Sequence, residues 1–361
     1  MKLHQYRSYE SLSLSPVPGV NVIVGENAQG KTNAVEAVFL CALGRSHRTS
    51  RDSELIMRDC AGAYVGVQFQ RGESLHEIEF KLKEGERRQV YVDKQAITRS
   101  AELMGQLNVV MFSPEDLSLI KGGPAERRRF VDMELSQLYP AYYRTLQQYN
   151  AVLKQRNALL KSDTAGLDTI SLWDEQLSRY GAFIMEKRAA FAQRLQAYGY
   201  ALHSAVTDGR ETLALSYAPN IEMEETGYPL IGKLMDSLSR CVGEDLRRGF
   251  TSVGPHRDDL SVLIDGAEAR VYGSQGQQRT AALSLKLSQI ELLRAETGEN
   301  PVLLLDDVLS ELDDMRGRLL LDALRACQSF ITCTSLAGLE RAGLTDYTAW
   351  RCADGNISPY Q

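Results

Sequence analysis

A phosphate-binding pattern stands near the start of the chain. It fits G-x-x-x-x-G-K-[ST] at every fixed position, in the residues Gly25-Glu26-Asn27-Ala28-Gln29-Gly30-Lys31-Thr32. The two glycines allow backbone N–H groups to surround a phosphate chain, and the N-terminus of a following helix adds a favourable dipole. Lys31 can then reach the β and γ phosphates, and the Thr32 hydroxyl can bind Mg²⁺. We therefore expect Gly25 to Asn33 to hold a nucleoside triphosphate with Mg²⁺.

A pair of carboxylates could complete such a site. Asp306 and Asp307 directly follow the apolar run Val302-Leu303-Leu304-Leu305. At the carboxyl end of a buried strand, Asp306 can hold Mg²⁺ through water, and Asp307 can orient or activate the water that attacks the γ-phosphate. The alternative is that two adjacent acids only cap the next helix or begin a turn. The phosphate loop in the same chain favours the catalytic interpretation.

Both motifs need strands and helices that bring them together. Residues 20–24, Val-Asn-Val-Ile-Val, predict a short buried strand before the loop, and the apolar spacing of 31–43 predicts a helix after it. Residues 302–305 and 330–333 predict two further core strands. We therefore expect an α/β core that is built from both ends of the chain.

Other strands are expected around this core. The segments 63–69, 75–82 and 88–92 are rich in Val, Ile, Phe and Tyr and are separated by turn residues, which predicts antiparallel strands. Residues 107–112 predict another buried strand, and residues 261–265 predict a strand after the middle of the chain. The strands of the chain should therefore form more than one sheet.

The middle of the chain has a helical pattern instead. From about 125 to 206, apolar residues recur every three or four positions on both sides of a polar break at 161–169. Two antiparallel helices that bury one another explain this pattern, and a coiled-coil arm is the alternative. We expect a core lobe of residues 1–120 and 250–361 and an inserted, mainly helical lobe of residues 121–249.

Composition excludes several classes of protein. The chain has 361 residues, of which 24% are charged, and its net charge is −6, so a generally basic, histone-like DNA coat is ruled out. No apolar stretch is long enough to span a membrane, and the first residues lack the apolar segment of a signal peptide. The six cysteines are scattered without a CxxC pair, which is typical of a reducing cytosol and gives no support to a zinc site. We expect a cytoplasmic protein.

A second set of residues lies between the helical region and the acidic strand. Ser274-Gln275-Gly276-Gln277 precedes a predicted helix, and a loop that contains Asp313 follows the acidic strand. An ordinary capped helix explains the first segment when it is taken alone. The order of phosphate loop, Ser-x-Gly-Gln, acidic strand and Asp-containing loop resembles the ABC-type ATPases. That resemblance implies that Ser274 and its neighbours touch the γ-phosphate bound by a second subunit, so that ATP would induce a homodimer.

Further segments extend this pattern over nearly the whole chain. They are Tyr6-Arg7-Ser8-Tyr9, Gly44-Arg45-Ser46-His47-Arg48, Phe112-Ser113-Pro114-Glu115-Asp116-Leu117, Lys121-Gly122-Gly123-Pro124, Arg127-Arg128-Arg129-Phe130-Val131-Asp132, Gln155-Arg156-Asn157 and Gly254-Pro255-His256-Arg257-Asp258-Asp259. Each segment is weak by itself, but the order and spacing make the set specific. In this order the chain resembles the RecF family of bacterial recombination mediator ATPases.

The resemblance implies an α/β ABC-type core with an inserted helical lobe and an ATP-dependent DNA-binding dimer. It also implies binding of duplex DNA near single-strand gaps, cooperation with RecR and RecO to help load the RecA recombinase, and slow ATP hydrolysis as a timing switch. Two features depart from the ABC superfamily. Asp307 stands where a Glu is usual, and Thr332-Cys333-Thr334-Ser335 stands where a switch histidine is expected. A hydroxyl such as that of Thr334 could hydrogen-bond the γ-phosphate but could not carry a charge like that of histidine.

Basic residues gather in two places despite the negative net charge. Residues 121–160 hold seven basic and three acidic side chains, a balance of +4, and a second cluster follows the first predicted helix. Such clusters can bind DNA phosphates without reading sequence, although a solvated helix face is the ordinary explanation of a charge run. Three consecutive arginines point in different directions around a helix, so they cannot all face one phosphate. The candidate DNA contacts are Arg45, Arg48, Arg127, Arg128 and Arg129.

Some alternatives stay open. The segment 254–259 is explained equally well by a turn before a strand and by a nucleotide-facing or interface-facing role. Glu115 lies near the position where ABC proteins place a γ-phosphate-sensing residue. The rival functions are a nuclease-coupled ATPase of the overcoming-lysogenization-defect type, the ATPase subunit of a transporter, and a generic P-loop ATPase that does not dimerise. No room remains after residue 340 for the metal-dependent nuclease domain that the first rival needs.

Overall fold

The computed structural model divides the chain into two compact units. It describes residues 1–162, 166–223, 229–311, 314–341 and 343–360. The first unit consists of Met1–Asp116 and Lys286–Gln361, and the second of Leu117–Leu285. The first boundary lies close to the predicted one at residue 120, but residues 250–285 belong to the second unit and not to the core lobe. The reason is strand pairing, because the strand at 259–264 pairs with a strand of the second unit.

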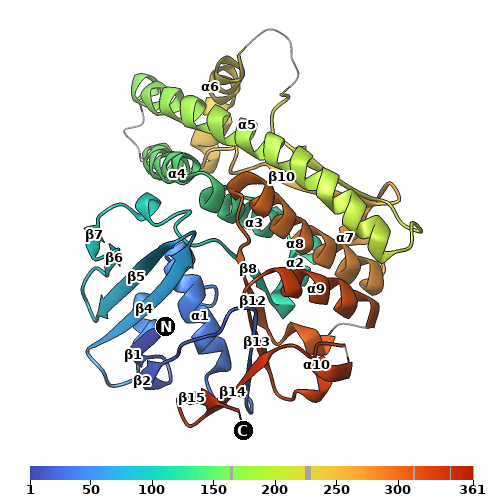
Figure 1. Ribbon diagram of the computed structural model, residues 1–361. Helices are drawn as coiled ribbons and strands as arrows, with labels where there is room; N and C mark the ends of the chain where they lie inside the picture. The colour runs from blue at the N-terminus through green and yellow to red at the C-terminus, as the bar shows by residue number, and fades with distance from the viewer. Residues whose placement is uncertain (163–165, 224–228, 312–313, 342, 361) are drawn as a thin grey trace. The chain divides into compact units, whose positions relative to one another are not determined.

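A mixed sheet forms the centre of the first unit (Figure 1). Its strands are, in spatial order, β15 (Asn356–Pro359), β14 (Thr348–Ala353), β3 (Val20–Val24), β13 (Ser329–Cys333), β12 (Val302–Asp306) and β8 (Val109–Phe112). The pairs from β14 to β8 are all parallel, and only β15 is antiparallel to its neighbour. All residues of β3 are buried, which explains its unbroken apolar sequence. The predicted core strands are confirmed, and they all end at the same edge.

A second, antiparallel sheet belongs to the same unit. Its strands are, in spatial order, β2 (Tyr9–Ser13), β1 (Lys2–Tyr6), β4 (Gly62–Arg71), β5 (Ser74–Lys83), β6 (Gln89–Val92) and β7 (Gln95–Ile97). Helix α1 (Lys31–Leu43) contacts β4 and β5 of this sheet as well as β8, β12 and β13 of the central sheet. A helix that is covered on two sides needs apolar residues all round, which fits the sequence of α1. The helix begins and ends where the sequence predicts.

Among its described residues, the first unit has further helices besides α1. Helices α9 (Asp314–Ala326) and α10 (Ala337–Arg341) belong to it, and helix α8 (Gln275–Thr297) continues into it from the second unit. Short 3₁₀ helices lie at Asp52–Leu55, Ser100–Glu102, Pro114–Leu117 and Val308–Glu311. Among the described helices, none combines the length and the apolar composition that crossing a membrane would require.

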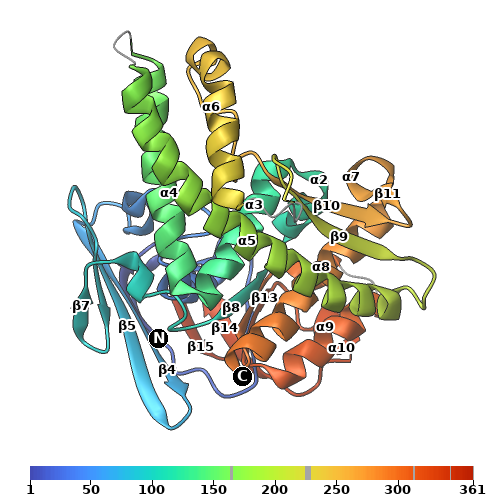
Figure 2. The same ribbon diagram turned by 90° about the horizontal axis from the view of Figure 1, so that it is seen from above.

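The second unit is mainly helical (Figure 2). Its helices are α2 (Ser118–Lys121), α3 (Pro124–Leu138), α4 (Pro140–Leu160), α5 (Leu167–Val206), α6 (Leu230–Arg248), α7 (Ala269–Tyr272) and the first part of α8. A small antiparallel sheet has the strands β11 (Ala267–Glu268), β10 (Asp259–Ile264) and β9 (Leu213–Ala218). Helix α5 has 40 residues, or about 60 Å, and packs on α4 and α6. The predicted helix pair is thus present, and α6 joins it.

Buried charges connect the helices of the second unit. Arg156 of α4 is fully buried and donates hydrogen bonds to Asp174 of α5 at 2.5 Å and to Asp245 of α6 at 2.7 Å. Arg188 of α5 binds Asp132 of α3 at 2.8 Å. Removal of one partner from such a pair leaves an uncompensated charge in the interior. These residues hold the unit together, and their burial removes them from any DNA-binding surface.

Candidate nucleotide-binding site

The phosphate loop follows β3 and leads into α1, in a space that admits only glycine at two positions. A Cβ atom on Gly25 would lie 2.2 Å from the carbonyl oxygen of Cys352, and one on Gly30 would lie 2.5 Å from Oγ of Ser8. Gly30 also has a φ of +109°, which side chains rarely adopt. The backbone of Cys352 and the side chains of Ser8 and Tyr9 therefore restrict the path of the loop from outside.

Residues far away in the chain hold the loop from outside. The Tyr9 hydroxyl donates to the carbonyl oxygen of Gly30 at 2.9 Å, and the Cys352 thiol donates to that of Gln29 at 3.3 Å. The backbone N–H of Asp354 donates to Oε1 of Gln29 at 2.9 Å. Sequence reasoning missed these three contacts, and no local pattern in the chain pointed to them.

The Lys31 side chain folds back over the loop. Its Nζ donates to the carbonyl oxygen of Gly25 at 2.7 Å and to that of Glu26 at 2.9 Å. The residue is only 6% exposed, so its charge sits close to the loop backbone. An ammonium group has three N–H donors, and these two contacts use two of them. The arrangement keeps a cation beside the backbone N–H groups at the start of α1.

The acidic strand meets the loop at the carboxyl edge of the central sheet. Thr32 Oγ1 donates to Asp306 Oδ1 at 2.8 Å, although 274 positions separate the residues. Strand β13 lies between β3 and β12, and its Thr332 donates to the same carboxylate oxygen at 2.7 Å. The parallel order of the strands produces this convergence, because the carboxyl ends of β3, β13 and β12 share one edge. Lys31, Thr32 and Asp306 thus form one site.

Asp307 is held in an uncommon conformation. Its φ is +56°, in the left-handed region that Asp tolerates better than most residues. Its backbone N–H donates to Thr332 Oγ1 at 3.1 Å, so one hydroxyl fixes both acidic residues. Sequence reasoning considered Thr334 for a hydroxyl role, but Thr334 is exposed, and Thr332 is the residue that contacts Asp306. Alternation along β13 gave no signal for Thr332, because residues 329–332 of this strand are all buried.

Oxygen ligands of the kind that Mg²⁺ prefers are present at this edge. The Thr32 hydroxyl and the Asp306 carboxylate are adjacent, and both are hard donors. The described residues contain no cluster of three or more His, Cys, Asp or Glu side chains that could hold a metal by itself. A magnesium site of this type takes few protein ligands and completes its shell with water and phosphate oxygens. The residues therefore fit Mg²⁺ bound together with a nucleotide.

The loop after α1 is tied to the first turns of that helix. Glu36 is fully buried and accepts two hydrogen bonds from Arg7, at 2.8 and 2.6 Å, and one from Ser46 at 2.5 Å. Arg48 donates to Oδ1 of Asn33 at 3.0 Å. Burial opposes the charge of Glu36, but the hydrogen bonds from Arg7 and Ser46 outweigh it and lower the pKa of this carboxyl. The sequence signal for this network was an acid, Glu36, within the apolar run of α1, and the sequence prediction did not use it.

Replacing Arg7 with methionine is expected to lower the free energy of unfolding by about 3–5 kcal/mol at pH 7, because Glu36 would stay buried without its main partner. The folded-state pKa of Glu36 lies below its ordinary value of 4.5, so the carboxylate stabilises the fold above that pH and loses this effect as the pH falls through the folded pKa. The difference between the two proteins should therefore shrink below about pH 4.5.

Urea unfolding at pH 7 and at pH 4, followed by tryptophan fluorescence and circular dichroism, measures this difference. Arg58→Met is the matched control, because the Arg58 side chain is 95% exposed. An equal effect of Arg7→Met and Arg58→Met, or an effect that does not change with pH, would contradict the role given to Glu36.

The turn after β8 is built around a second ion pair, between the half-buried Asp116 and the buried Lys286. The backbone N–H of Ser113 donates to Asp116 at 2.9 Å, and Nζ of Lys286 lies 3.5 Å from the same carboxylate. Burial raises the pKa of Asp116, although Lys286 and the hydrogen bond from Ser113 act in the opposite direction. Glu115 accepts a hydrogen bond from the Ser113 hydroxyl at 3.3 Å. The hydrogen bonds of Ser113 with Glu115 and Asp116 thus hold Glu115, the residue near the position of the γ-phosphate sensor of ABC proteins.

The Ser-x-Gly-Gln residues, 274–277, lie in the second unit, at the exposed start of α8. The Gln277 N–H donates to Ser274 Oγ at 3.2 Å, and the Ser274 N–H donates to Gln277 Oε1 at 2.9 Å. These reciprocal bonds form a capping box. Ser274, Gln275 and Gly276 are exposed. The Ser274 oxygen accepts within the cap, so its O–H remains a donor for another group. Asp313 lies outside the described residues.

The segment 254–259 has a structural role in the second unit. Tyr149 and Thr251 flank the His256 ring, with the Tyr149 hydroxyl 2.6 Å from Nδ1 and the Thr251 carbonyl oxygen 3.0 Å from Nε2. Burial lowers the pKa of His256 to about 4, so the ring is neutral and donates from Nε2. Asp258 accepts a hydrogen bond from the backbone N–H of Asn220 at 2.6 Å. The turn interpretation of this segment fits these contacts.

The candidate DNA contacts differ in accessibility. Arg127 forms a bidentate ion pair with Asp259, at 2.7 and 2.8 Å, and its side chain is 6% exposed, which argues against a phosphate contact. Arg128 is half-buried and donates to the carbonyl oxygen of Asp258 at 2.6 Å. Arg45, Arg48 and Arg129 are exposed. The consecutive arginines thus point to different surroundings, as helix geometry predicts.

Comparisons with known proteins agree with this architecture. The family model described as RecF/RecN/SMC N terminal domain matches residues 1–345. A DNA replication and repair protein RecF of Lachnoclostridium phytofermentans is 47% identical over 339 residues, which cover 93% of this chain and 92% of the relative. The RecF protein of Alkaliphilus oremlandii is 43% identical over 359 residues, or 99% of this chain and 98% of the relative.

Solved structures give the same result. A structure of the recombination mediator protein RecF-ATPrS in the RecFOR pathway has a TM-score of 0.93 and 37% identity, and the match covers 100% of this chain and 97% of that one. An SMC head bound to the C-winged helix domain of ScpA has a TM-score of 0.56 at 16% identity, which shows a shared fold alone. The ABC-type ATPase core predicted from the sequence is confirmed. By sequence over almost its whole length and by structure, the chain belongs to the RecF family.

Proposed function

We propose that the chain is a DNA replication and repair ATPase of the RecFOR pathway. In this proposal ATP induces a dimer that clamps duplex DNA near single-strand gaps, and slow, DNA-stimulated hydrolysis opens it again. The observation that carries the proposal is the convergence of Lys31, Thr32 and Asp306 at one edge of the central sheet. The RecF names of the relatives and the RecF-ATP structures support it. Bacterial DNA lies in the cytoplasm, so the proposal includes a cytoplasmic location.

Each residue at this edge of the central sheet would have a separate role in ATP binding and hydrolysis. The N–H groups of residues 25–33 would bind the phosphate chain, and Lys31 would exchange its carbonyl partners for β and γ phosphate oxygens. Thr32 and Asp306 would hold Mg²⁺, which would neutralise charge on the phosphates. Asp307, with its backbone fixed by Thr332, would orient the attacking water. An Asp is shorter than the usual Glu, which is consistent with slow turnover.

The second half of the site would come from another copy of the chain. The Ser274 hydroxyl and the N–H groups at the start of α8 are exposed, and the capping box fixes their direction. Such a helix start favours an anion, and the γ-phosphate bound by a partner copy is the anion in this proposal. Two chains would then enclose two ATP molecules. The proposed roles of Gln275, Gly276, Gln277 and Asp313 belong to this half.

The DNA surface in the proposal includes the exposed arginines Arg45, Arg48 and Arg129 and leaves out Arg127. Phosphate contacts from such residues would be salt-sensitive and largely independent of sequence. RecR and RecO are the proposed protein partners, and help in loading RecA is the proposed outcome. The transporter rival predicts no DNA binding, and the generic ATPase rival predicts no dimer.

Light scattering with and without ATP·Mg²⁺, and with and without a short gapped duplex, tests the proposal. The mass is expected to double from 40.2 kDa with ATP, and the dimer should retain DNA less well as salt rises. A monomer under all conditions would contradict the clamp, and a dimer that ignores DNA would favour another ATPase of the same fold.

A further inference from the structure

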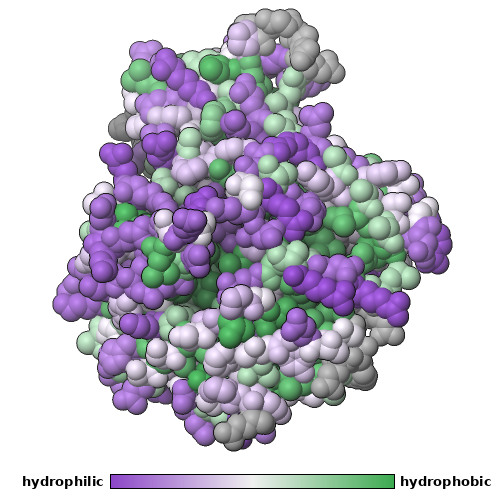
Figure 3. All heavy atoms as spheres, viewed as in Figure 1, coloured by the Kyte–Doolittle hydropathy of each residue, from purple (hydrophilic) through white to green (hydrophobic). Residues whose placement is uncertain are grey.

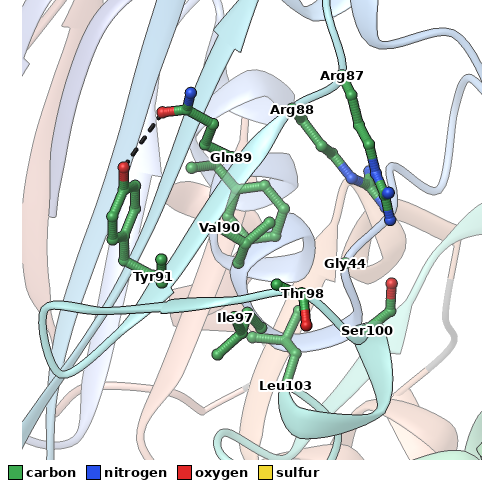
Figure 4. A pocket seen from close by; sticks show the side chains of 12 residues that line it. Gly44, Arg87, Arg88, Gln89, Val90, Tyr91, Ile97, Thr98, Ser100 and Leu103 are labelled. Carbon is green, nitrogen blue, oxygen red and sulfur yellow. Dashed lines mark hydrogen bonds between the residues drawn. The ribbon is translucent and has the colours of Figure 1, made fainter.

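A cavity lies at the free edge of the antiparallel sheet in the first unit, away from the residues assigned to the nucleotide (Figure 4). It has a volume of about 410 Å³, which falls within the range of ligand sites. Its lining comes from β5, the turn between β5 and β6, β6, β7, the residues after β7, and Gly44 at the end of α1. Gly44 lets the wall close tightly, since a Cβ there would lie 3.1 Å from Leu103.

The floor of the cavity is a row of apolar side chains that extends beyond the part of the sheet covered by helix α1. Phe80 of β5 pairs with Val90 of β6, which pairs with Ile97 of β7, so the three side chains lie in line on one face. Phe80 is fully buried, whereas Val90 and Ile97 are only half-buried. Helix α1 covers the face at β4 and β5. The row therefore presents aliphatic surface beyond the part that α1 covers.

Two arginines form the wall above this floor. Figure 4 shows the side chains of Arg87 and Arg88 extending in the same direction, on the same side of the view as Ser100. Arg88 is fixed by Asp52 at 3.3 Å and by the ring of Phe80, with a distance of 5.7 Å from the guanidinium carbon to the ring centre. Arg87 is exposed and has no ion-pair partner within the part of the chain that the structure describes. The lining contains no acidic residue, and although Asp52 offsets the charge of Arg88, the charge of Arg87 makes the cavity favour an anion.

The edge strand adds a third feature. Strand β7 is the last in its sheet, and it presents backbone N–H and C=O groups on the side away from β6. An extended peptide can add to such an edge, with specificity from pockets for its side chains. Around these strands, hydrophilic residues predominate on the left of the face drawn in Figure 3, with few hydrophobic ones among them. Apolar floor, arginines and free edge thus occur together at one place.

We propose that this cavity binds an extended acidic segment of a partner protein. One apolar side chain of the segment would lie on Val90 and Ile97, and a carboxylate would bind Arg87. DNA fits less well, because the accessible part of the floor, Val90 and Ile97, is aliphatic, and Lys81 Nζ lies over the ring of Tyr91 at 4.6 Å. The site is independent of the phosphate loop, so it does not require the ATP-driven dimer.

Fluorescence anisotropy with the full chain tests this proposal. The probe is a short labelled peptide in which acidic residues flank one Leu and one Phe. Two control peptides replace the acids by their amides or the Leu and Phe by Ser, and both should bind at least about tenfold more weakly. Equal binding of the three peptides, or no binding of the probe, would overturn the proposal.

Variants of the chain locate the binding. Arg87→Glu should weaken binding about tenfold or more, while Arg58→Glu makes the same charge change at an exposed position and should have no effect. Ile97→Thr keeps a β-branched side chain and should weaken binding several-fold without unfolding β7. Equal affinity of Arg87→Glu and Arg58→Glu would place the peptide elsewhere and overturn the assignment.

Two further measurements distinguish peptide binding at this cavity from ATP binding and from DNA binding. Lys31→Ala should bind the peptide normally even if it no longer responds to ATP, so failure of the ATP clamp and failure of this site give different results. A gapped duplex should not displace the peptide. Displacement by the duplex, with DNA binding lost in Arg87→Glu, would assign the cavity to DNA and overturn the proposal.

Discussion

Replacing Lys31 with alanine is expected to abolish the doubling of molar mass that ATP·Mg²⁺ causes in the unchanged chain. The Lys31 ammonium is nearly buried and lies over the loop, where its two carbonyl partners hold it at 2.7 and 2.9 Å. Each charge-assisted hydrogen bond to a phosphate contributes about 1.5–3 kcal/mol, so ATP affinity should fall about a hundredfold. Without bound ATP, no γ-phosphate remains for the second copy.

Equilibrium dialysis measures the affinity, and light scattering measures the mass. Lys94→Ala is the matched control, because Lys94 lies exposed in the turn between β6 and β7. The control should bind ATP and dimerise normally. Dimers of Lys31→Ala at an ATP concentration that only just saturates the unchanged chain would exclude the role given to this lysine.

Ser274→Arg should also fail to dimerise, but unlike Lys31→Ala it should bind ATP with normal affinity. Ser274 lies at the exposed start of α8, and a long cationic side chain there would occupy the place of the partner's phosphate. The ATP-binding residues belong to the first unit and Ser274 to the second, so binding by a single chain should not depend on it. The loss of the cap would cost only about 1 kcal/mol of helix stability.

Two controls separate closure from folding. Ser274→Thr keeps both the hydroxyl and the cap and should still dimerise. Ser171→Arg makes the same change at an exposed position of α5 and should behave like the unchanged chain. Normal ATP-dependent mass doubling in Ser274→Arg would refute a site shared between two copies.

The parts of the site that depend on local sequence could be predicted. The glycine loop, β3 and α1 follow from short patterns of glycine, apolar residues and turn residues, and their bounds agree with the structure. The acidic pair at the end of β12 was also found, because an apolar run that ends in two acids is a local signal.

Contacts between distant segments could not be predicted in the same way. Thr332 reaches Asp306 only because β13 lies between β3 and β12, and spatial strand order is not written in any one segment. The basic cluster and the family resemblance predict Arg127 as a DNA contact, whereas its partner Asp259 lies 132 positions away. The extent of the inserted unit was misjudged for a similar reason, since β10 pairs with β9 and not with the central sheet.

The contacts of Gln29 with Cys352 and Asp354 have a consequence for synthesis. These residues follow the phosphate loop by 323 and 325 positions. At about 5–20 residues per second, a ribosome needs roughly 16–65 s to make that length of chain. The second unit is continuous in sequence and is synthesised in full before β12, β13 and β14. A nascent or prematurely terminated chain can therefore fold its helical unit while its nucleotide loop still lacks the outer support.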